Sequence, residues 1–262
     1  AGEPNLYDVT LTLLRDGVGD AFVSAGSTGA LLTGATLTVK RIHGIRRAAL
    51  APVLPAGEHG VMLIDCGANV DCKPEYLVQF GLMGDAYMRG VMGIENPRVG
   101  LINIGAEAEK GNALVKETYP LMETAPYNFV GNVEARDITG DVADVLVADG
   151  FTGNVFLKTY EGVALTLFSN VKDVMMKSAM TKVAALILKG GLKELKTKFD
   201  ANAVGGAPIL GVQKPVIKAH GSSKEVAFKN AIRQAISFTE SGAIATIEEN
   251  LPKKAEADEN EQ

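Results

Sequence analysis

A short apolar segment followed by a turn rich in glycine and small polar residues occurs five times along the chain. The segments end at Ser24, Asp65, Asn103, Gly131 and Ala148, and their turns begin AGSTG, CGAN, IGAE, NVE and DGFTG. Apolar segments of this length that are bounded by glycine turns and alternate with helical patterns are typical of βαβ units. The sequence therefore predicts an α/β fold in three layers, with a mostly parallel sheet between helices.

A sixth run, Gly205 to Ser223, reads GGAPILGVQKPVIKAHGSS and carries the densest set of polar side chains. Its alternation predicts a strand that presents Lys218 and His220 on one face where the strand ends. The apolar spacing after Ser223 predicts a helix that Ser222 or Ser223 can cap, and free N–H groups at a helix start attract anions. The run therefore predicts an anion site, although a plain capped turn has the same spacing.

All six polar turns follow predicted strands. In an open α/β sheet with mostly parallel strands, ligands bind at the edge where the strands end. We therefore expect the six turns to converge on one cleft, at one edge of a single sheet.

Composition excludes several classes of protein. No apolar run approaches the roughly 20 residues that span a bilayer, and a net charge of −5 argues against general binding of nucleic acid. Cys66 and Cys72 are the only cysteines, too few for a zinc or iron–sulfur site, and we expect reduced thiols in a cytosolic protein. Asp65, Asp71 and Asp149 stand in turns, where aspartate bonds backbone N–H groups, so we expect neither a metal nor a cofactor.

One basic segment stands out in this acidic chain. Residues 172–198 hold seven lysines and only two acidic residues. Within them, the apolar run 183–188 and the pair Gly190-Gly191 predict two helices, over about 161–203, joined by a glycine turn with an apolar tip. The tip could contact an anionic membrane or the apolar side could pack on a partner subunit, and the two can coexist. The membrane contacts would be Val183, Leu186, Ile187, Leu188 and Lys189.

Eight motifs follow one another along the chain: AFVSAGSTGALL, LAPVLP, DCGANVDCKPEYLVQF, ENPRVGLINIGAEAEKGN, FVGNVEARDI, VADGFTGNVFLK, GGAPILGV and PVIKAHGSS. Together they resemble the bacterial phosphate acyltransferase family called PlsX, from about Gly19 to Thr246. The resemblance implies transfer of a fatty acyl group from acyl-acyl-carrier protein to orthophosphate. The product, acyl phosphate, would feed phospholipid synthesis.

The resemblance also implies partners and a location. It implies a fold like that of isocitrate and isopropylmalate dehydrogenases, a homodimer, and peripheral contact with the inner face of the bacterial membrane. The downstream glycerol-3-phosphate acyltransferase is a further partner that it implies, and we expect the protein in the cytoplasm.

Three departures from the family pattern are visible. The family usually begins with a strand and a DAMGGD-like segment, which this chain lacks, whereas Ser27 replaces a common Asn and Ala135 a common Gly. Ser27 can still donate and accept hydrogen bonds. We expect a single catalytic domain over residues 1–250 without that first strand, followed by a disordered acidic tail over 251–262.

The reaction requires phosphate to be held against a thioester carbonyl. The Lys218 ammonium is a natural phosphate ligand, His220 is expected to position phosphate rather than act as a general base, and the amide of Asn69 or Asn132 could stabilise the oxyanion. Arg136 is either a second phosphate ligand or the partner of Asp137 in an ion pair. The remaining substrate contacts that we expect are Ser24, Ser27, Thr28, Gly29, Asp65, Gly67, Asp149, Asn154, Ser222 and Ser223.

Two alternatives to this function remain. One is an enzyme that uses an acyl-CoA in the same cleft, and the other is a membrane scaffold that binds the carrier protein without catalysis. A basic patch of Lys40, Arg41, Arg46 and Arg47 could receive an acidic carrier protein, although such patches are usually just solvated surface.

Overall fold

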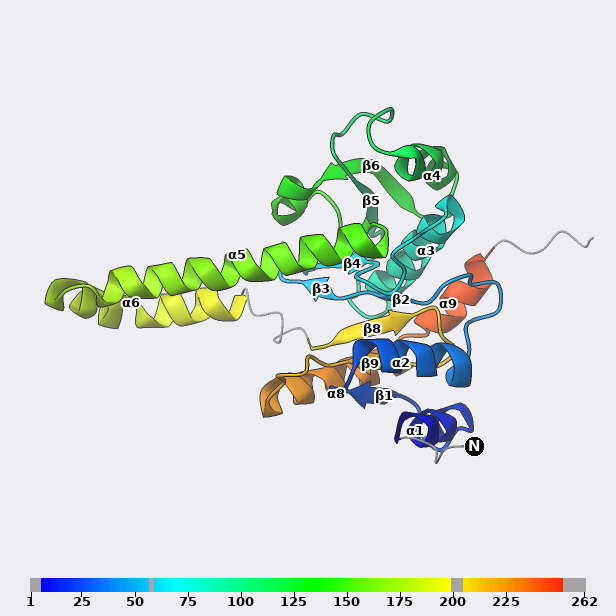
Figure 1. Cartoon of the computed structure of the whole chain (residues 1–262), viewed down its shortest axis with the longest axis horizontal. Helices are drawn as coiled ribbons and strands as arrows, with labels where there is room; N and C mark the ends of the chain where they lie inside the picture. Colours follow the sequence, from blue (N-terminus) through cyan, green and yellow to red (C-terminus); the bar gives the residue numbers. More distant parts are fainter. Residues whose placement is uncertain (1–5, 57–58, 199–204, 252–262) are drawn as a thin grey trace, which may run out of the picture.

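The computed structural model describes residues 6–56, 59–198 and 205–251, and its strands lie between helices in an α/β fold (Figure 1). Four strands form one sheet in the order β1-β9-β8-β2, and five form a second in the order β3-β4-β7-β5-β6. The strands are β1 (Phe22–Ser24), β2 (Ala49–Leu50), β3 (Val53–Leu54), β4 (Val61–Ile64), β5 (Arg98–Asn103), β6 (Asn128–Glu134), β7 (Val145–Val147), β8 (Ala207–Leu210) and β9 (Val216–Lys218).

Successive side chains of a strand point to opposite faces of the sheet. Apolar side chains on both faces are therefore buried against helices. In β9, Val216 shares a core with the first two helices, whereas its neighbour Ile217 shares a core with the helix that follows the strand. The helices are α1 (Leu6–Arg15), α2 (Thr28–Gly34), α3 (Pro74–Gly90), α4 (Ala113–Glu123), α5 (Gly150–Met176), α6 (Ala179–Lys198), α8 (Glu225–Glu240) and α9 (Ala243–Asn250), with a π-helical turn η1 (Ala35–Val39) that continues α2 and a 3-10 turn η2 (Ala135–Gly140) after β6.

Residues 49–54, which contain β2 and β3, join the two sheets. On one side the N–H of Ala51 donates to the carbonyl of Pro208, next to Ile209 in β8. On the other side the N–H of Leu63, in β4, donates to the carbonyl of Pro52. Backbone hydrogen bonds on both edges of this segment therefore join the two sheets.

The prediction of a mostly parallel sheet is confirmed only in part, because four of the seven pairings among the described strands are parallel and three are antiparallel. β4, β7, β5 and β6 are parallel to one another, and β1 is parallel to β9. β8, however, is antiparallel to both β9 and β2, and β3 is antiparallel to β4. The short connection over 211–215 explains the β8–β9 pairing, since a parallel pair needs a crossover of about a dozen residues. Strands β1 and β9 therefore run opposite to β4, β5, β6 and β7.

The helical hairpin is formed by α5 and α6, which project away from both sheets (Figure 1). Its turn lies at Lys177-Ser178, and not at Gly190-Gly191 as predicted, because both glycines lie inside α6. The leucine, alanine and lysine residues around the two glycines favour helix strongly enough to continue it through them. Residues 199–203 of the predicted hairpin, and 252–262 of the predicted tail, lie outside the described residues.

Candidate active site

The first group of predicted site residues lies where β1 and β9 end, which we call the β1/β9 edge. Ser24 and Lys218 are register partners in this parallel pair, and the N–H of Ala219 donates to the carbonyl of Ser24 at 2.9 Å. The following loops are also close, because a Cβ built on Gly221 would lie 3.8 Å from the carbonyl oxygen of Ala25. The loops over 24–29 and 218–223 therefore lie side by side.

Lys218 and His220 supply the ionisable groups of this edge. The Lys218 side chain is half-buried, burial lowers the pKa of its ammonium group, and the Nζ atom donates to the carbonyl of Ala219. The exposed His220 accepts a hydrogen bond at Nδ1 from the N–H of Ser222 (3.2 Å), whose Oγ lies 2.7 Å from the same atom. Because Nδ1 accepts, the ring proton of neutral His220 lies on Nε2.

Two helices begin at this edge. The N-cap residue of α8 is Lys224, whose side chain makes no capping hydrogen bond, so the predicted serine cap is wrong. The N–H groups of the first turn therefore lack a side-chain partner from the cap. The buried Oγ of Ser223 has no hydrogen-bond partner among the described residues. At α2, Ser27 accepts from the N–H of Ala30 at 3.5 Å, and Thr28 begins the exposed first turn.

Sequence reasoning missed one residue here, Tyr7 of α1. Its hydroxyl lies 3.1 Å from the Oγ of Ser24, which also accepts from the N–H of Gly26 at 3.1 Å. Gly26 permits this approach, because a Cβ on it would lie 1.9 Å from the Tyr7 hydroxyl. No motif singled out Tyr7, and the demand for glycine opposite it becomes visible only in the fold.

The second group lies where β4 and β7 end, the β4/β7 edge, and it centres on Asp65. This side chain is 0% exposed. One carboxylate oxygen accepts from the N–H groups of Leu50 (2.9 Å) and Ala68 (3.2 Å), and the other from the N–H and the Nδ2 of Asn69 (2.6 and 3.0 Å). Burial raises the pKa of Asp65, although these hydrogen bonds oppose the shift. In this arrangement the carboxylate fixes a turn and has no free face for substrate.

Asn69 is also committed to structure. Its Nδ2 donates to the carbonyl of Ala48 at 2.8 Å as well as to Asp65, so both amide hydrogens are used. The backbone carbonyl of Asn69 accepts from the N–H of Gly150, at the start of α5, at 2.8 Å. The predicted oxyanion role of Asn69 is therefore not supported.

The start of α5 closes this edge. Asp149 caps the helix through the N–H of Thr152 at 2.9 Å and accepts from its hydroxyl at 2.7 Å. A Cβ on Gly67 would lie 3.5 Å from the side chain of Asn154. The predicted residues Asp149, Gly67 and Asn154 are thus brought together, with Asp149 in a capping role.

Asn132 lies in β6 of the same sheet, and Arg136 lies in the turn η2 that follows it. The Nδ2 of Asn132 donates to the carbonyl of Glu107 at 2.9 Å, which leaves a buried Oδ1 without a partner among the described residues. The Oδ1 cannot donate to an oxyanion, but only one of the two Nδ2 hydrogens is used on Glu107, so the oxyanion role of Asn132 stays a prediction. Arg136 is 76% exposed and pairs with Glu134 at 2.7 Å and with Asp137 at 3.8 Å, which favours the ion-pair alternative.

The prediction of one converging cleft is therefore wrong. The β1/β9 edge and the β4/β7 edge are the carboxyl ends of strands that run in opposite directions. The shared segment 49–54 reverses the direction between them, because it pairs antiparallel on both sides.

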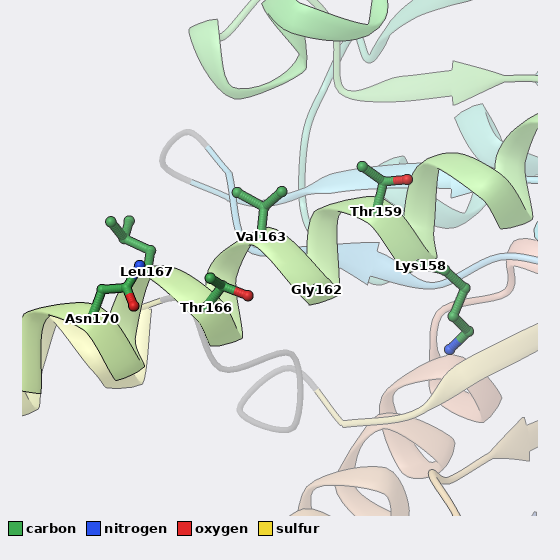
Figure 2. A pocket seen from close by; sticks show the side chains of 7 residues that line it. All are labelled: Lys158, Thr159, Gly162, Val163, Thr166, Leu167 and Asn170. Carbon is green, nitrogen blue, oxygen red and sulfur yellow. The ribbon is translucent and has the colours of Figure 1, made fainter. Parts of the chain in front are cut away.

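Two hollows in the described part of the chain bear on the site. One, of about 480 Å³, lies along the middle of α5, and Figure 2 shows that its lining side chains come from that helix alone. The other, of about 300 Å³, runs between α1 and the helix formed by α2 and η1, and we call it the α2 groove. It is lined by Tyr7, Asp8, Gly29, Ala30, Thr33, Gly34, Leu37 and Thr38.

The remaining predicted contacts lie on the surface. Lys40, Arg41, Arg46 and Arg47 are exposed just beyond η1, and the predicted membrane residues Val183, Leu186, Ile187, Leu188 and Lys189 are largely exposed on α6. Within the described ranges, no three His, Cys, Asp or Glu side chains form a metal cluster, and no helix is long and apolar enough to cross a bilayer.

Comparison with known proteins identifies the family. A family model described as "Fatty acid synthesis protein" matches residues 6–246. Phosphate acyltransferase from Clostridium acetobutylicum is 54% identical over 250 residues, which cover 95% of this chain and 75% of the relative. The enzyme of the same name from Clostridium novyi is 51% identical over 252 residues, covering 96% and 76%. The chain belongs to the PlsX phosphate acyltransferase family.

The motif resemblance is thereby confirmed, and membership of the phosphate acyltransferase family makes the chain an acyltransferase. Solved structures extend the likeness at the level of fold. A phosphotransacetylase from Streptococcus pyogenes superposes with a TM-score of 0.59 at 18% identity, covering 92% of this chain and 67% of that one. A branched-chain phosphotransacylase from Enterococcus faecalis V583 gives 0.59 at 18% identity, covering 92% and 81%.

Proposed function

We propose that this phosphate acyltransferase transfers a fatty acyl group from acyl-acyl-carrier protein to orthophosphate, for use in phospholipid synthesis by a glycerol-3-phosphate acyltransferase. The observation that carries the proposal is the β1/β9 edge. There a half-buried lysine ammonium and an exposed histidine stand beside the starts of α2 and α8. Cationic groups and free helix N–H groups are the donors that hold a phosphate dianion.

Phosphate binding is assigned to residues of this edge. The Lys218 ammonium balances charge, the hydroxyls of Ser222 and Ser223 donate to phosphate oxygens, and the Nε2–H of His220 orients the ion. The buried, unpartnered Oγ of Ser223 gains a partner when phosphate binds. Fixing phosphate in this way turns a bimolecular encounter into an oriented attack.

The chemical step needs no external base. An oxygen of monohydrogen phosphate attacks the thioester carbonyl carbon, the C–S bond breaks, and the phosphate proton leaves with the thiolate as the carrier thiol. The products are acyl phosphate and free carrier protein. Both amide hydrogens of Asn69 are used elsewhere, and the Nδ2 of Asn132 already donates to Glu107. We assign stabilisation of the oxyanion to N–H groups in the first turn of α8.

The hairpin is assigned to assembly and membrane contact. On α5, Val163 and Leu167 are 62% and 58% exposed beside the 480 Å³ hollow (Figure 2). On α6, Leu186 and Ile187 are 71% and 78% exposed. Apolar surface of this kind marks an interaction site. We propose that the α5 face packs on a second copy in a homodimer, and that the α6 face, with its lysines, contacts an anionic membrane.

The test is detection of acyl phosphate by mass spectrometry after the purified chain is mixed with palmitoyl-carrier protein, with and without orthophosphate. Product that appears only with phosphate supports the proposal. Product from palmitoyl-CoA but not from palmitoyl-carrier protein would show that the acyl donor is acyl-CoA. Carrier binding without any product would favour the non-catalytic scaffold.

A further inference from the structure

The α2 groove runs from the β1/β9 edge towards the four exposed cations that follow η1. Gly29, at its near end, stands in the first turn of α2, and Thr38, at its far end, stands in the last turn of η1. At roughly 1.5 Å per residue, the nine steps between them span about 14 Å. The groove therefore has the length of an extended linear substituent rather than of a compact ligand.

The near end opens beside the proposed phosphate site. Tyr7 lines the groove and contacts Ser24, with 3.1 Å between the hydroxyl oxygens. Ser24 is the register partner of Lys218. A group that reaches the near end of the groove consequently arrives next to the residues that would hold phosphate.

The far end leads to a rigid cationic surface, which we call the basic platform (Lys40, Arg41, Arg46 and Arg47). Gln79 of α3 fixes its backbone, accepting from the N–H of Arg46 at 2.8 Å and donating to the carbonyl of Gly44 at 2.9 Å. The guanidinium of Arg47 lies 5.4 Å from the ring centroid of Tyr76. Within the described residues none of the four cations has a carboxylate within 4.0 Å.

The chemistry of the groove suits a chain that alternates amides with short apolar units. Thr33 and Thr38 supply hydroxyls that can bond amide groups, Gly29 and Ala30 leave room for the backbone of a ligand, and Leu37 is a 71% exposed apolar contact. Gly34 brings α1 close enough to form the opposite wall, since a Cβ there would lie 2.6 Å from Leu11. A purely apolar acyl chain would leave both threonine hydroxyls without a partner.

We propose that the α2 groove binds the pantetheine arm of the acyl thioester and that the basic platform receives the acidic surface of the carrier protein at the end of that arm. Pantetheine occurs in both carrier proteins and CoA, so the groove serves either donor and the platform only the carrier. The inference deepens the proposed function and rests on it. It assigns substrate contacts to residues outside the loops that would hold phosphate.

Thr33→Phe tests the groove, with Leu13→Phe on the exposed side of α1 as the matched control and Thr38→Phe as a second groove variant. Calorimetry measures the binding of CoA itself, so the readout does not depend on turnover. We expect the dissociation constant of CoA to rise at least tenfold in the folded groove variant and to stay unchanged in Leu13→Phe. Equal affinity in wild type and both groove variants, or no CoA binding in wild type, overturns the groove.

Turnover then separates the two donors. For Thr33→Phe, kcat/KM should fall at least tenfold for palmitoyl-CoA relative to palmitoyl-N-acetylcysteamine, which lacks most of the arm. For Lys40→Glu with Arg46→Glu, kcat/KM should fall at least tenfold for palmitoyl-carrier protein relative to palmitoyl-CoA, with a weaker dependence on salt. Equal losses for both donors overturn the platform. Wild-type protein that binds CoA but makes no acyl phosphate contradicts the proposed function and leaves the groove supported.

Discussion

Lys218 is the residue on which phosphate use should depend most. Lys218→Ala removes the half-buried ammonium of the β1/β9 edge, so we expect the KM for phosphate to rise at least tenfold while the KM for the thioester changes little. Steady-state kinetics with each substrate varied in turn measures both constants. The exposed Lys229→Ala on α8 is the control, and an unchanged KM for phosphate in Lys218→Ala would remove this residue from the site.

The same residue predicts a dependence on pH. Burial lowers the pKa of Lys218, so its ammonium loses the proton at a lower pH than an exposed lysine does. Only the protonated form attracts phosphate, and the KM for phosphate should therefore rise as pH increases towards that lowered pKa. Lys218→Ala should abolish this rise, and a pH profile of the KM in both proteins checks it.

Asp65 should matter for folding rather than for phosphate. In Asp65→Asn an NH₂ group replaces a carboxylate oxygen that accepts from Asn69, so a buried N–H loses its acceptor. We expect the free energy of unfolding to fall by about 1–3 kcal/mol, measured by urea denaturation. Asp71→Asn, at an exposed position, is the control, and equal stability of the two variants would contradict the assignment.

At this scale the sequence located polar residues better than it assigned their roles. It placed Lys218, His220 and the adjacent serines on one loop because alternation and the glycine turn are local signals. It could not foresee that the amide hydrogens of Asn69 would bond Ala48 and Asp65, since Ala48 belongs to a segment that becomes a neighbour only when the sheets join.

Among the elements, α6 differs most from its prediction. Gly190 and Gly191 lie inside the helix, and a Cβ on either would meet nothing within 4 Å. Gly190→Ala with Gly191→Ala should therefore stabilise the helix, by about 0.5–1 kcal/mol at each position. Slower amide hydrogen exchange along α6 measures the gain.

Faster amide exchange in this variant would support the predicted turn at Gly190-Gly191, because alanine at a position with positive φ is destabilising. Gly153→Ala is the contrasting variant within the same hairpin. A Cβ on Gly153 would lie 1.9 Å from the carbonyl oxygen of Asp65, so this change should destabilise the protein.

Loop length carries information on strand direction. The runs that became β8 and β9 are separated by residues 211–215 alone, too few for a crossover helix. The apolar pattern by itself carries no information on direction, because parallel and antiparallel strands of a buried sheet use the same residues. The division of the strands into two sheets depends on tertiary contacts, which the apolar pattern does not encode.

For the whole molecule, the two exposed faces of the hairpin should have separable roles. Leu186→Glu with Leu188→Glu should abolish sedimentation with phosphatidylglycerol vesicles, because it places two negative charges on the α6 face beside an anionic surface. Val163→Glu with Leu167→Glu carries the same charge change on α5 and should instead give a monomer in analytical ultracentrifugation.

Each variant is the control for the other. Vesicle binding that survives in Leu186→Glu with Leu188→Glu would remove the α6 face from membrane contact. A dimeric mass in Val163→Glu with Leu167→Glu would show that the α5 face is not the subunit interface.

The segment 49–54 has a consequence for how the molecule loses its structure. The backbone of this segment is hydrogen-bonded to β8 on one side and to β4 on the other. Unfolding of either sheet at this point therefore breaks hydrogen bonds of the other sheet as well. Proteins whose parts share no such element often melt in separate steps, whereas here the two sheets should unfold together, in one cooperative transition. Fluorescence or exchange probes placed in β9 and in β5 should then report the same midpoint in urea.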